Sequence, residues 1–295
     1  MLRDAPGRRR GGTRLPAARE RPHAAFHELV RLPEKDLDLV EASLEIARDE
    51  YPRLSLRTYL ARLDRLAAGA GRVIGKPRSL RVVIERLNRF LFDQEGFRGN
   101  TDDYYDPRNS YLHEVLDRQL GLPISLSILA IGVGERCGLT VMGVGLPGHF
   151  IAKSVNEAGD EVLFDPFHGG QLLDCEGVER LISAVTGHPF HAHEDSLAAT
   201  PPGHVAQRML NNLKATLLKS GHFARAARVI SRLTQLVPSD PTQRRDLGVS
   251  LVQAGECGQA IKHLRAYLEM APTADDAAAA RQFLREARKQ VAKWN

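Results

Sequence analysis

The sequence has too few cysteines for a disulfide framework. Only Cys137, Cys175 and Cys257 occur in 295 residues, an odd number with no C-x-x-C spacing, which also argues against a structural zinc site. No apolar run approaches the roughly 20 residues that a membrane-spanning helix needs, and the first residues lack the apolar centre of a secretory signal. We therefore expect a cytoplasmic protein with reduced thiols, no membrane contact, no cofactor and no bound metal.

Acidic residues are nearly absent from the first 22 positions. Seven arginines stand there against Asp4 and Glu20, a net charge of +5 that equals the formal charge of the whole chain. The segment is rich in Gly, Pro and Ala without apolar periodicity, which is typical of a disordered tail or an over-extended gene start. We predict a disordered basic leader over residues 1–25, whose charge favours at most weak, salt-dependent contact with nucleic acid.

Apolar residues recur at spacings of three and four over much of the first half of the chain, which predicts amphipathic helices. The expected helices cover about residues 37–47, 56–68 and 80–92, and Gly69-Ala70-Gly71 should end the second. Ser110 is expected to cap a helix over residues 111–119. Pro123 suits the first turn of a further helix reaching Cys137, which is apolar almost all round and should be buried at the centre of its domain.

Short apolar runs separated by glycine follow this central helix. Residues 140–146, 150–155 and 162–164 are expected to form strands, the last two in a hairpin-like arrangement. Helices followed by a small antiparallel sheet make an α+β fold, which we assign to residues 26–190. Residues 191–204, with adjacent prolines and little periodicity, are expected to form a linker; its histidines and His188 could bind metal only opportunistically.

A repeat marks the last part of the chain, residues 205–295. A shift of 34 residues superimposes Leu213 on Leu247, Leu217 on Leu251, Gly221 on Gly255, Ala226 on Ala260 and Pro238 on Pro272. This period, with those residue types, is typical of tetratricopeptide repeats, although an unrelated helical bundle is the alternative. We expect two helical hairpins and a capping helix over residues 275–293, which together bind a protein or peptide partner and perform no chemistry.

Three residues of the α+β part could form a nucleophilic site. Ser125 stands at the start of the central helix, His149 begins a predicted strand and Asp165 ends another. Nucleophilic catalysis needs a hydroxyl or thiol within reach of an imidazole that a carboxylate orients, and paired strands would bring His149 and Asp165 together. A histidine beside a glycine is also common as a structural residue.

Several short motifs, in this order, carry a family resemblance. They are Gly96-Phe97-Arg98-Gly99-Asn100, Asp106-Pro107-Arg108-Asn109-Ser110-Tyr111-Leu112, Val115-Leu116-Asp117-Arg118, Gly121-Leu122-Pro123, Leu146-Pro147-Gly148-His149-Phe150 and Phe164-Asp165-Pro166-Phe167. Over residues 26–294 the chain resembles the SirB family, bacterial proteins with a transglutaminase-like domain followed by tetratricopeptide repeats. The resemblance implies a papain-like core in which a cysteine at the start of the central helix pairs with a strand histidine and a following aspartate.

The resemblance places His149 and Asp165 at the histidine and aspartate positions, but it finds no cysteine. Counting back from Gly138 puts the nucleophile at Pro123 or, with a shift of two residues, at Ser125. A helix N-terminus would help a serine there to stabilise an oxyanion, while capping of the helix explains Ser125 without catalysis. We expect a non-catalytic transglutaminase-like protein that binds a partner through its core cleft and its repeats; the alternative is a hydrolase or acyltransferase using Ser125, His149 and Asp165.

A polar and aromatic loop precedes the central helix. Its glycines, prolines and asparagines predict a structured turn region. The candidate groove residues in it are Asn100, Asp102, Tyr104, Tyr105 and Asn109. The loop could instead coordinate a hard cation through oxygen atoms, but EF-hand spacing is absent, and a solvated turn is the simpler interpretation.

Overall fold

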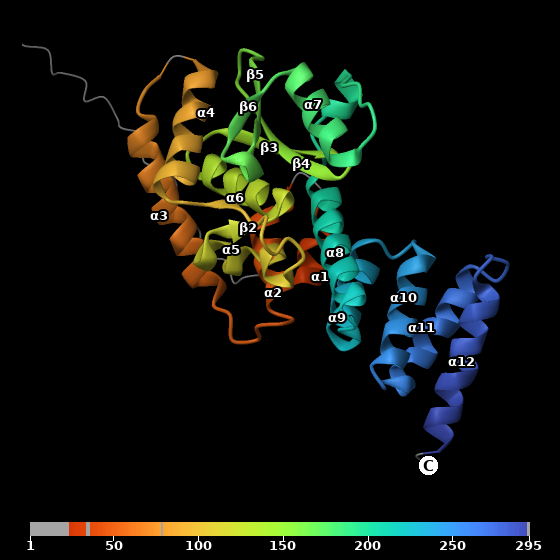
Figure 1. Ribbon diagram of the computed structural model, residues 1–295. Coiled ribbons are helices and arrows are strands. Elements are labelled where there is room, and N and C mark those ends of the chain that lie inside the picture. The colour runs from red at the N-terminus through yellow and green to blue at the C-terminus, as the bar shows by residue number, and fades with distance from the viewer. Residues whose placement is uncertain (1–23, 34–35, 78, 294–295) are drawn as a thin grey trace, which may run out of the picture.

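The computed structural model describes residues 24–33, 36–77 and 79–293 (Figure 1). The charged residues of the predicted leader lie outside these ranges, so its disorder and its contact with nucleic acid stay predictions. Within the described ranges, no helix combines the length and the apolar character needed to cross a bilayer.

Helices and a small sheet form the first part of the chain, and helices alone form the second (Figure 1). The helices of the first part are α1 (Phe26–Leu29), α2 (Leu39–Ala47), α3 (Leu56–Ile74), α4 (Leu80–Asn88), α5 (Leu112–Arg118), α6 (Pro123–Arg136) and α7 (Cys175–Thr186), with a π-helical turn η2 (Arg89–Gln94) and the 3-10 turns η3 (Pro107–Ser110), η4 (Pro166–His168) and η5 (Glu194–Leu197). The strands are β1 (Arg98–Gly99), β2 (Leu120–Gly121), β3 (Thr140–Leu146), β4 (His149–Val155), β5 (Glu161–Asp165) and β6 (Gln171–Leu173). This arrangement confirms the predicted α+β fold class.

Helix α6 is the buried centre of the first part, as the sequence predicts. Pro123 occupies its first position, where a missing N–H costs no intrahelical hydrogen bond. Every residue from Pro123 to Gly134 is buried, and the helix packs against β3, β4 and α3. Because it is surrounded on all sides, its N-terminus is held at a fixed place beside the sheet.

Four antiparallel strands in the order β3-β4-β5-β6 form the main sheet. The tight β3–β4 turn pairs Leu146 with His149, and Gly148 adopts a φ of +66° within it. Strand β5 pairs with β4 through Ala152 opposite Phe164, so Asp165 ends the strand that lies beside the one His149 begins. Strand β6 and helix α7 have no counterpart among the predicted elements.

The glycine run at residues 69–71 does not end α3, contrary to the prediction. The helix continues to Ile74 and stops at Gly75, which has a φ of +64°. A Cβ at Gly69 would lie 2.5 Å from Cζ of Phe90, so this glycine lets an aromatic ring pack against the helix. A helical glycine costs about 1 kcal/mol relative to alanine, and the burial of Phe90 compensates for it.

Ser110 is not the predicted helix cap. It belongs to η3, and Tyr111 takes the N-cap position of α5 without a capping hydrogen bond from its side chain. The helix ends at Arg118, and Gln119 follows in the left-handed conformation with a φ of 58°.

The second part consists of α8 (Pro202–Lys219), α9 (Phe223–Leu236), α10 (Pro241–Gln253), α11 (Cys257–Met270) and α12 (Ala277–Ala292). Gly221 and Gly255 adopt φ values of +72° and +81° at the matching turns between helices, 34 residues apart. The superimposed alanines, Ala226 and Ala260, are both fully buried. The 34-residue repeat thus corresponds to two helical hairpins, α8–α9 and α10–α11, followed by α12.

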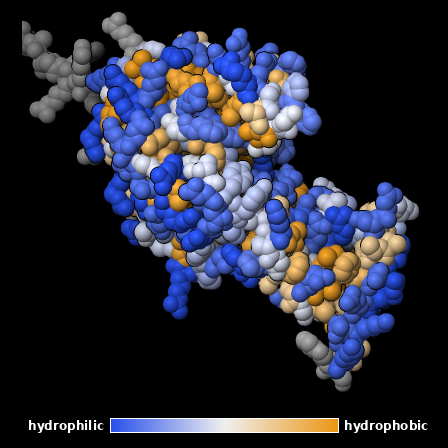
Figure 2. Space-filling view, viewed as in Figure 1, coloured by the Kyte–Doolittle hydropathy of each residue, from blue (hydrophilic) through white to orange (hydrophobic). Residues whose placement is uncertain are grey.

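Helices α8 and α9 join the repeat region to the core. The apolar side of α8 is buried, and this helix contacts α2, α6, η3 and β3. From α9, Arg225 and Arg228 pair with Glu50, and Arg232 pairs with Asp49. The remaining repeat helices extend from the core as a narrower arm, on whose surface hydrophobic residues lie between hydrophilic ones (Figure 2).

Candidate functional site

Ser125 serves the start of α6 structurally. Its hydroxyl donates to the carbonyl oxygen of Asn109 over 2.6 Å and accepts from the N–H of Leu122 over 2.9 Å. The side chain is 1% exposed. Among the described residues, no hydrogen bond joins Ser125 to His149, so the structure places the predicted nucleophile in a cap rather than beside the predicted base.

The structure does bring His149 and Asp165 together. Nε2 of His149 lies 2.8 Å from Oδ2 of Asp165, and both side chains are almost fully buried. Oδ1 of Asp165 accepts from the backbone N–H groups of Phe167 and His168, which fixes the carboxylate at the start of η4. Burial alone would raise the pKa of Asp165, but the hydrogen bonds and charges of His149 and His168 outweigh it and lower that pKa.

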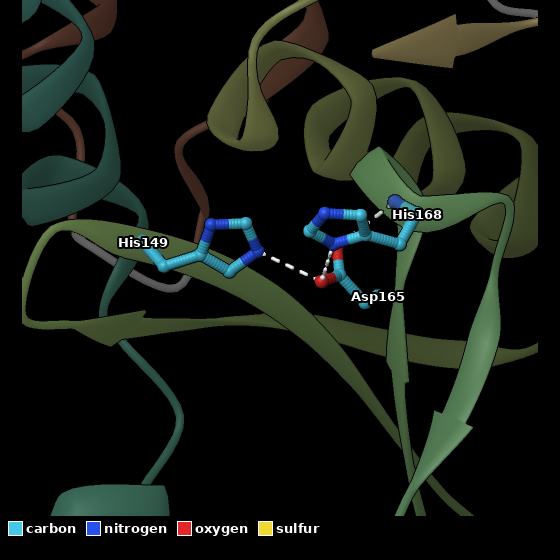
Figure 3. Close-up of side chains that lie close together, drawn as sticks. All are labelled: His149, Asp165 and His168. Carbon is cyan, nitrogen blue, oxygen red and sulfur yellow. Dashed lines mark hydrogen bonds and ion pairs between the residues drawn. The ribbon is translucent and has the colours of Figure 1, made fainter. Parts of the chain in front are cut away.

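His168 completes the cluster, and the sequence did not single it out. Its Nδ1 lies 2.7 Å from the same Oδ2 of Asp165, and its ring stacks on that of His149 with centroids 5.7 Å apart. Figure 3 shows both imidazoles directed at one carboxylate. The spacing Asp-Pro-Phe-His after a strand was the available signal, because a 3-10 turn returns the third residue to the aspartate.

The three side chains also offer a donor set for a metal ion. Their nitrogen and oxygen atoms lie within 4.8 Å of one another, and two imidazoles with a carboxylate are ligands that Zn²⁺ accepts. Hydrogen bonds between them already satisfy the converging atoms. The absence of a metal therefore stays a prediction.

The cysteines lie in other parts of the fold. Cys137 follows the last residue of α6, about 21 Å along the helix axis from Pro123 at 1.5 Å per residue, and its thiol donates to the carbonyl oxygen of Ala67. Burial raises the pKa of the Cys137 thiol, which lowers the share of the nucleophilic thiolate. Cys175 begins α7 and Cys257 begins α11.

A pocket of about 530 Å³ opens beside His149. It is lined by Tyr104, Tyr105, Leu122, Pro123, Ile124, Leu146, Pro147, Gly148, His149, Phe150, Arg208, Asn212, Ala215, Thr216 and Lys219. The first residues of α6 form one side of it and α8 forms another, so the core and the repeat region build it jointly. Pro123 lines the pocket, whereas Ser125 does not.

Two contacts from α8 shape this pocket. One nitrogen of Arg208, Nη2, donates to the carbonyl oxygens of Leu146 and His149 over 2.7 and 2.6 Å, so the guanidinium braces the β3–β4 turn. Burial lowers the pKa of Arg208. Nζ of Lys219 lies 4.4 Å from the ring centroid of Tyr105, a cation–π contact at the rim.

The five candidate groove residues divide into two groups. Tyr104 and Tyr105 line the pocket. Asn100 and Asn109 are buried and hold the loop together, since the Asn100 amide donates to the Asn109 side chain over 3.0 Å. Asp102 is exposed and does not line the pocket.

Comparison with known proteins agrees with this architecture. The profile of the Transglutaminase-like superfamily matches residues 57–211, and that of the Tetratricopeptide repeat matches residues 213–285. A UPF0162 protein of Xylella fastidiosa is 34% identical over 84% of this chain and 89% of its own length. A UPF0162 protein of Vibrio cholerae is 28% identical over 83% of this chain and 91% of its own.

A more distant relative shares only part of the chain. F-box only protein 21 of Mus musculus is 29% identical over 60% of this chain, which corresponds to 27% of that protein. No solved structure gives a significant match.

Proposed function

We propose, from the premise that this chain belongs to the transglutaminase-like superfamily and to the UPF0162 proteins, that it is a non-catalytic member that binds a protein or peptide partner. The partner would contact both the core pocket and the helical repeats. His149 and Asp165 would then serve binding and structure rather than the breaking of a bond.

The state of the α6 N-terminus carries this proposal. A covalent mechanism needs a nucleophile whose proton a base can take, within about 3 Å of that base. Pro123 lines the pocket beside His149 and has no nucleophilic group. The hydroxyl of Ser125, two residues on, donates a hydrogen bond to the carbonyl oxygen of Asn109, and the three thiols lie in other parts of the fold.

The repeats support the binding half of the proposal. Tetratricopeptide units generally form surfaces for protein contacts, and here the first repeat helix also lines the core pocket through Arg208, Asn212 and Lys219. A partner seated in the pocket would therefore touch both parts of the chain.

A hydrolase or acyltransferase using Ser125, His149 and Asp165 is the second candidate. The 2.8 Å contact between His149 and Asp165 favours it, because such a carboxylate orients a catalytic imidazole. For catalysis the Ser125 hydroxyl would have to leave the Asn109 carbonyl and turn toward His149.

Labelling of the full chain with a fluorophosphonate probe, which reacts with activated serines, separates the two. We expect no labelling of the parent protein above that of Ser125→Ala, because the Ser125 proton is held by a backbone carbonyl. Ser127→Ala is the matched control, since Ser127 is also buried and donates only to the carbonyl of Pro123. Labelling that Ser125→Ala abolishes and Ser127→Ala keeps would establish the enzyme instead.

Two finer assignments remain part of this proposal. The order of the motifs supports a place in the SirB family, and the spacing of the cysteines supports a cytoplasmic location. The candidate roles of Ser125, His149, Asp165 and the groove residues likewise stay predictions, as do the domain boundaries at residues 190 and 205.

A further inference from the structure

The charge of the pocket beside His149 has one sign. Among the described residues that line it, only Arg208 and Lys219 carry a permanent charge, and none is an aspartate or glutamate. A bound carboxylate would therefore meet two cations and no anion. The pocket is electrostatically complementary to an acidic group.

The two pocket cations differ from the other lysines and arginines of the α8–α9 hairpin, which form ion pairs with carboxylates. Among the lysines and arginines of α8 and α9, Lys214 pairs with Asp246, Arg225 and Arg228 pair with Glu50, and Arg232 pairs with Asp49. Arg208 and Lys219 form no ion pair with any described residue; Arg208 is held by two carbonyl oxygens and Lys219 by the Tyr105 ring. The two cations left without a carboxylate are the two that face the pocket.

The core side of the pocket adds two further features. Helix α6 begins with Pro123, which has no N–H, so its first amide is that of Ile124. This N–H has no hydrogen-bond acceptor among the described residues, and helix N-termini favour anions. His149 is 4% exposed and lines the pocket. Its Nε2 is bonded to Asp165, while no described residue bonds to its Nδ1, so this nitrogen is available to a ligand.

Most of the remaining lining is apolar or aromatic, and Asn212 and Thr216 add two neutral polar side chains from α8. Tyr104, Leu122, Leu146 and Phe150 surround the charged groups. A volume of 530 Å³ lies in the usual range of binding pockets, about 300–1,000 Å³. An occupant that fills it needs an apolar or aromatic side chain beside its carboxylate.

We propose that this pocket binds an acidic segment of a partner protein, in which an aspartate or glutamate lies next to an apolar or aromatic residue. The carboxylate meets Arg208 and Lys219, and the neighbouring side chain contacts the apolar wall. This assignment rests on the proposed binding function and names the chemistry of the partner. A peptide fits better than a small molecule because Tyr105, 62% exposed, and Lys219 stand at the rim, where a bound chain can continue onto the repeat helices.

Two pools of short fluorescent peptides test the assignment on the full chain by fluorescence anisotropy. One pool carries glutamate or aspartate beside randomised apolar residues, and the other carries glutamine or asparagine at the same positions. We expect the acidic pool to bind at least about tenfold more tightly, and Lys219→Glu to remove that preference, since the reversal replaces attraction by repulsion. Lys289→Glu is the matched control, because it makes the same change at an exposed lysine on α12 that does not line the pocket.

Three outcomes would overturn the assignment. They are equal affinity for the two pools, an equal loss in Lys219→Glu and Lys289→Glu, and full displacement of the peptides by inorganic phosphate at constant ionic strength, which would mark a site for small anions. Lys219 is exposed, so its substitution leaves the fold intact; urea unfolding of each variant checks this.

Failure of this assignment and failure of the proposed function give different results. If the two peptide pools bind equally and Ser125 is not labelled, the non-catalytic function is retained and only the acidic partner is ruled out. Labelling of Ser125 removes the non-catalytic function, whereas the peptide measurement still reports which segments the pocket accepts.

Discussion

Two buried histidines of the core domain differ in what surrounds them. His149 and His113 are each 4% exposed. His149 is bonded to a carboxylate, whereas neither ring nitrogen of His113 has a hydrogen-bond partner in the described part of the chain. The nearest carboxylate oxygen there, of Glu114, lies 3.9 Å from Nε2 of His113. The comparison teaches that burial alone does not mark a functional imidazole, because the partner atoms decide whether the ring is oriented or merely packed.

The environment of His113 is aromatic. Its ring centroid lies 4.2 Å from that of Tyr51, 5.6 Å from that of Tyr59 and 6.0 Å from that of Tyr111. The phenols of Tyr51 and Tyr59 donate to Glu114 and Asp117, so the nearby acids are occupied by other groups. Burial is the largest influence on the pKa of His113 and lowers it, since a charge there would be poorly solvated.

The largest expected effect is that of His149→Leu. This substitution leaves the Asp165 carboxylate buried with one imidazole partner fewer, while His168 and two backbone N–H groups remain. The loss of one hydrogen bond to a buried charged group costs about 1.5–3 kcal/mol. Urea denaturation should show this decrease in the free energy of unfolding. A decrease below about 1 kcal/mol would mean that His168 alone satisfies the carboxylate.

A smaller effect of opposite sign is expected from His113→Leu. Leucine removes two buried nitrogens that have no partner among residues 24–33, 36–77 and 79–293, and each such group costs about 1–3 kcal/mol when buried. The free energy of unfolding should rise by about 1 kcal/mol once the change of shape is included. A large decrease in the same denaturation experiment would show that water or a ligand bonds to His113.

The smallest effect concerns pH. The pKa of His113 is lowered in the folded state, so the unfolded state binds more protons on acidification. The stability is therefore fully present above the ordinary histidine pKa of about 6.5 and is lost as the pH falls from there through the folded-state pKa. His113→Leu should therefore lose less stability than the parent on acidification below about pH 6.5. Urea midpoints measured across this range give the difference, and parallel curves would contradict the assignment.

Local patterns predicted most of the fold because local residues decide those elements. The apolar run of α6 and the 34-residue repeat needed no knowledge of the packing. The glycines of α3 were misassigned because the reason for Gly69 is the ring of Phe90, which lies on another element. The prediction that Ser110 caps α5 was wrong for a similar reason, because Ser110 is part of the 3-10 turn η3.

The candidate site was predictable only in part. The His149–Asp165 contact follows from strand order, and the sequence could suggest it. The pocket wall could not be foreseen, because Arg208 reaches the carbonyl of Leu146 across 62 positions of chain. Such a contact depends on how α8 packs against the sheet, and amphipathic periodicity does not predict the position of one element relative to another.

The bracing of the β3–β4 turn by Arg208 has a thermodynamic consequence. If α8 were to separate from the sheet, both hydrogen bonds of the guanidinium would break and one wall of the pocket would be lost in the same event. The pocket is therefore complete only while α8 is packed against the sheet. Occupancy and docking are linked equilibria, so whatever fills the pocket adds its binding free energy to the attachment of the repeats, and whatever pulls the repeats away expels it.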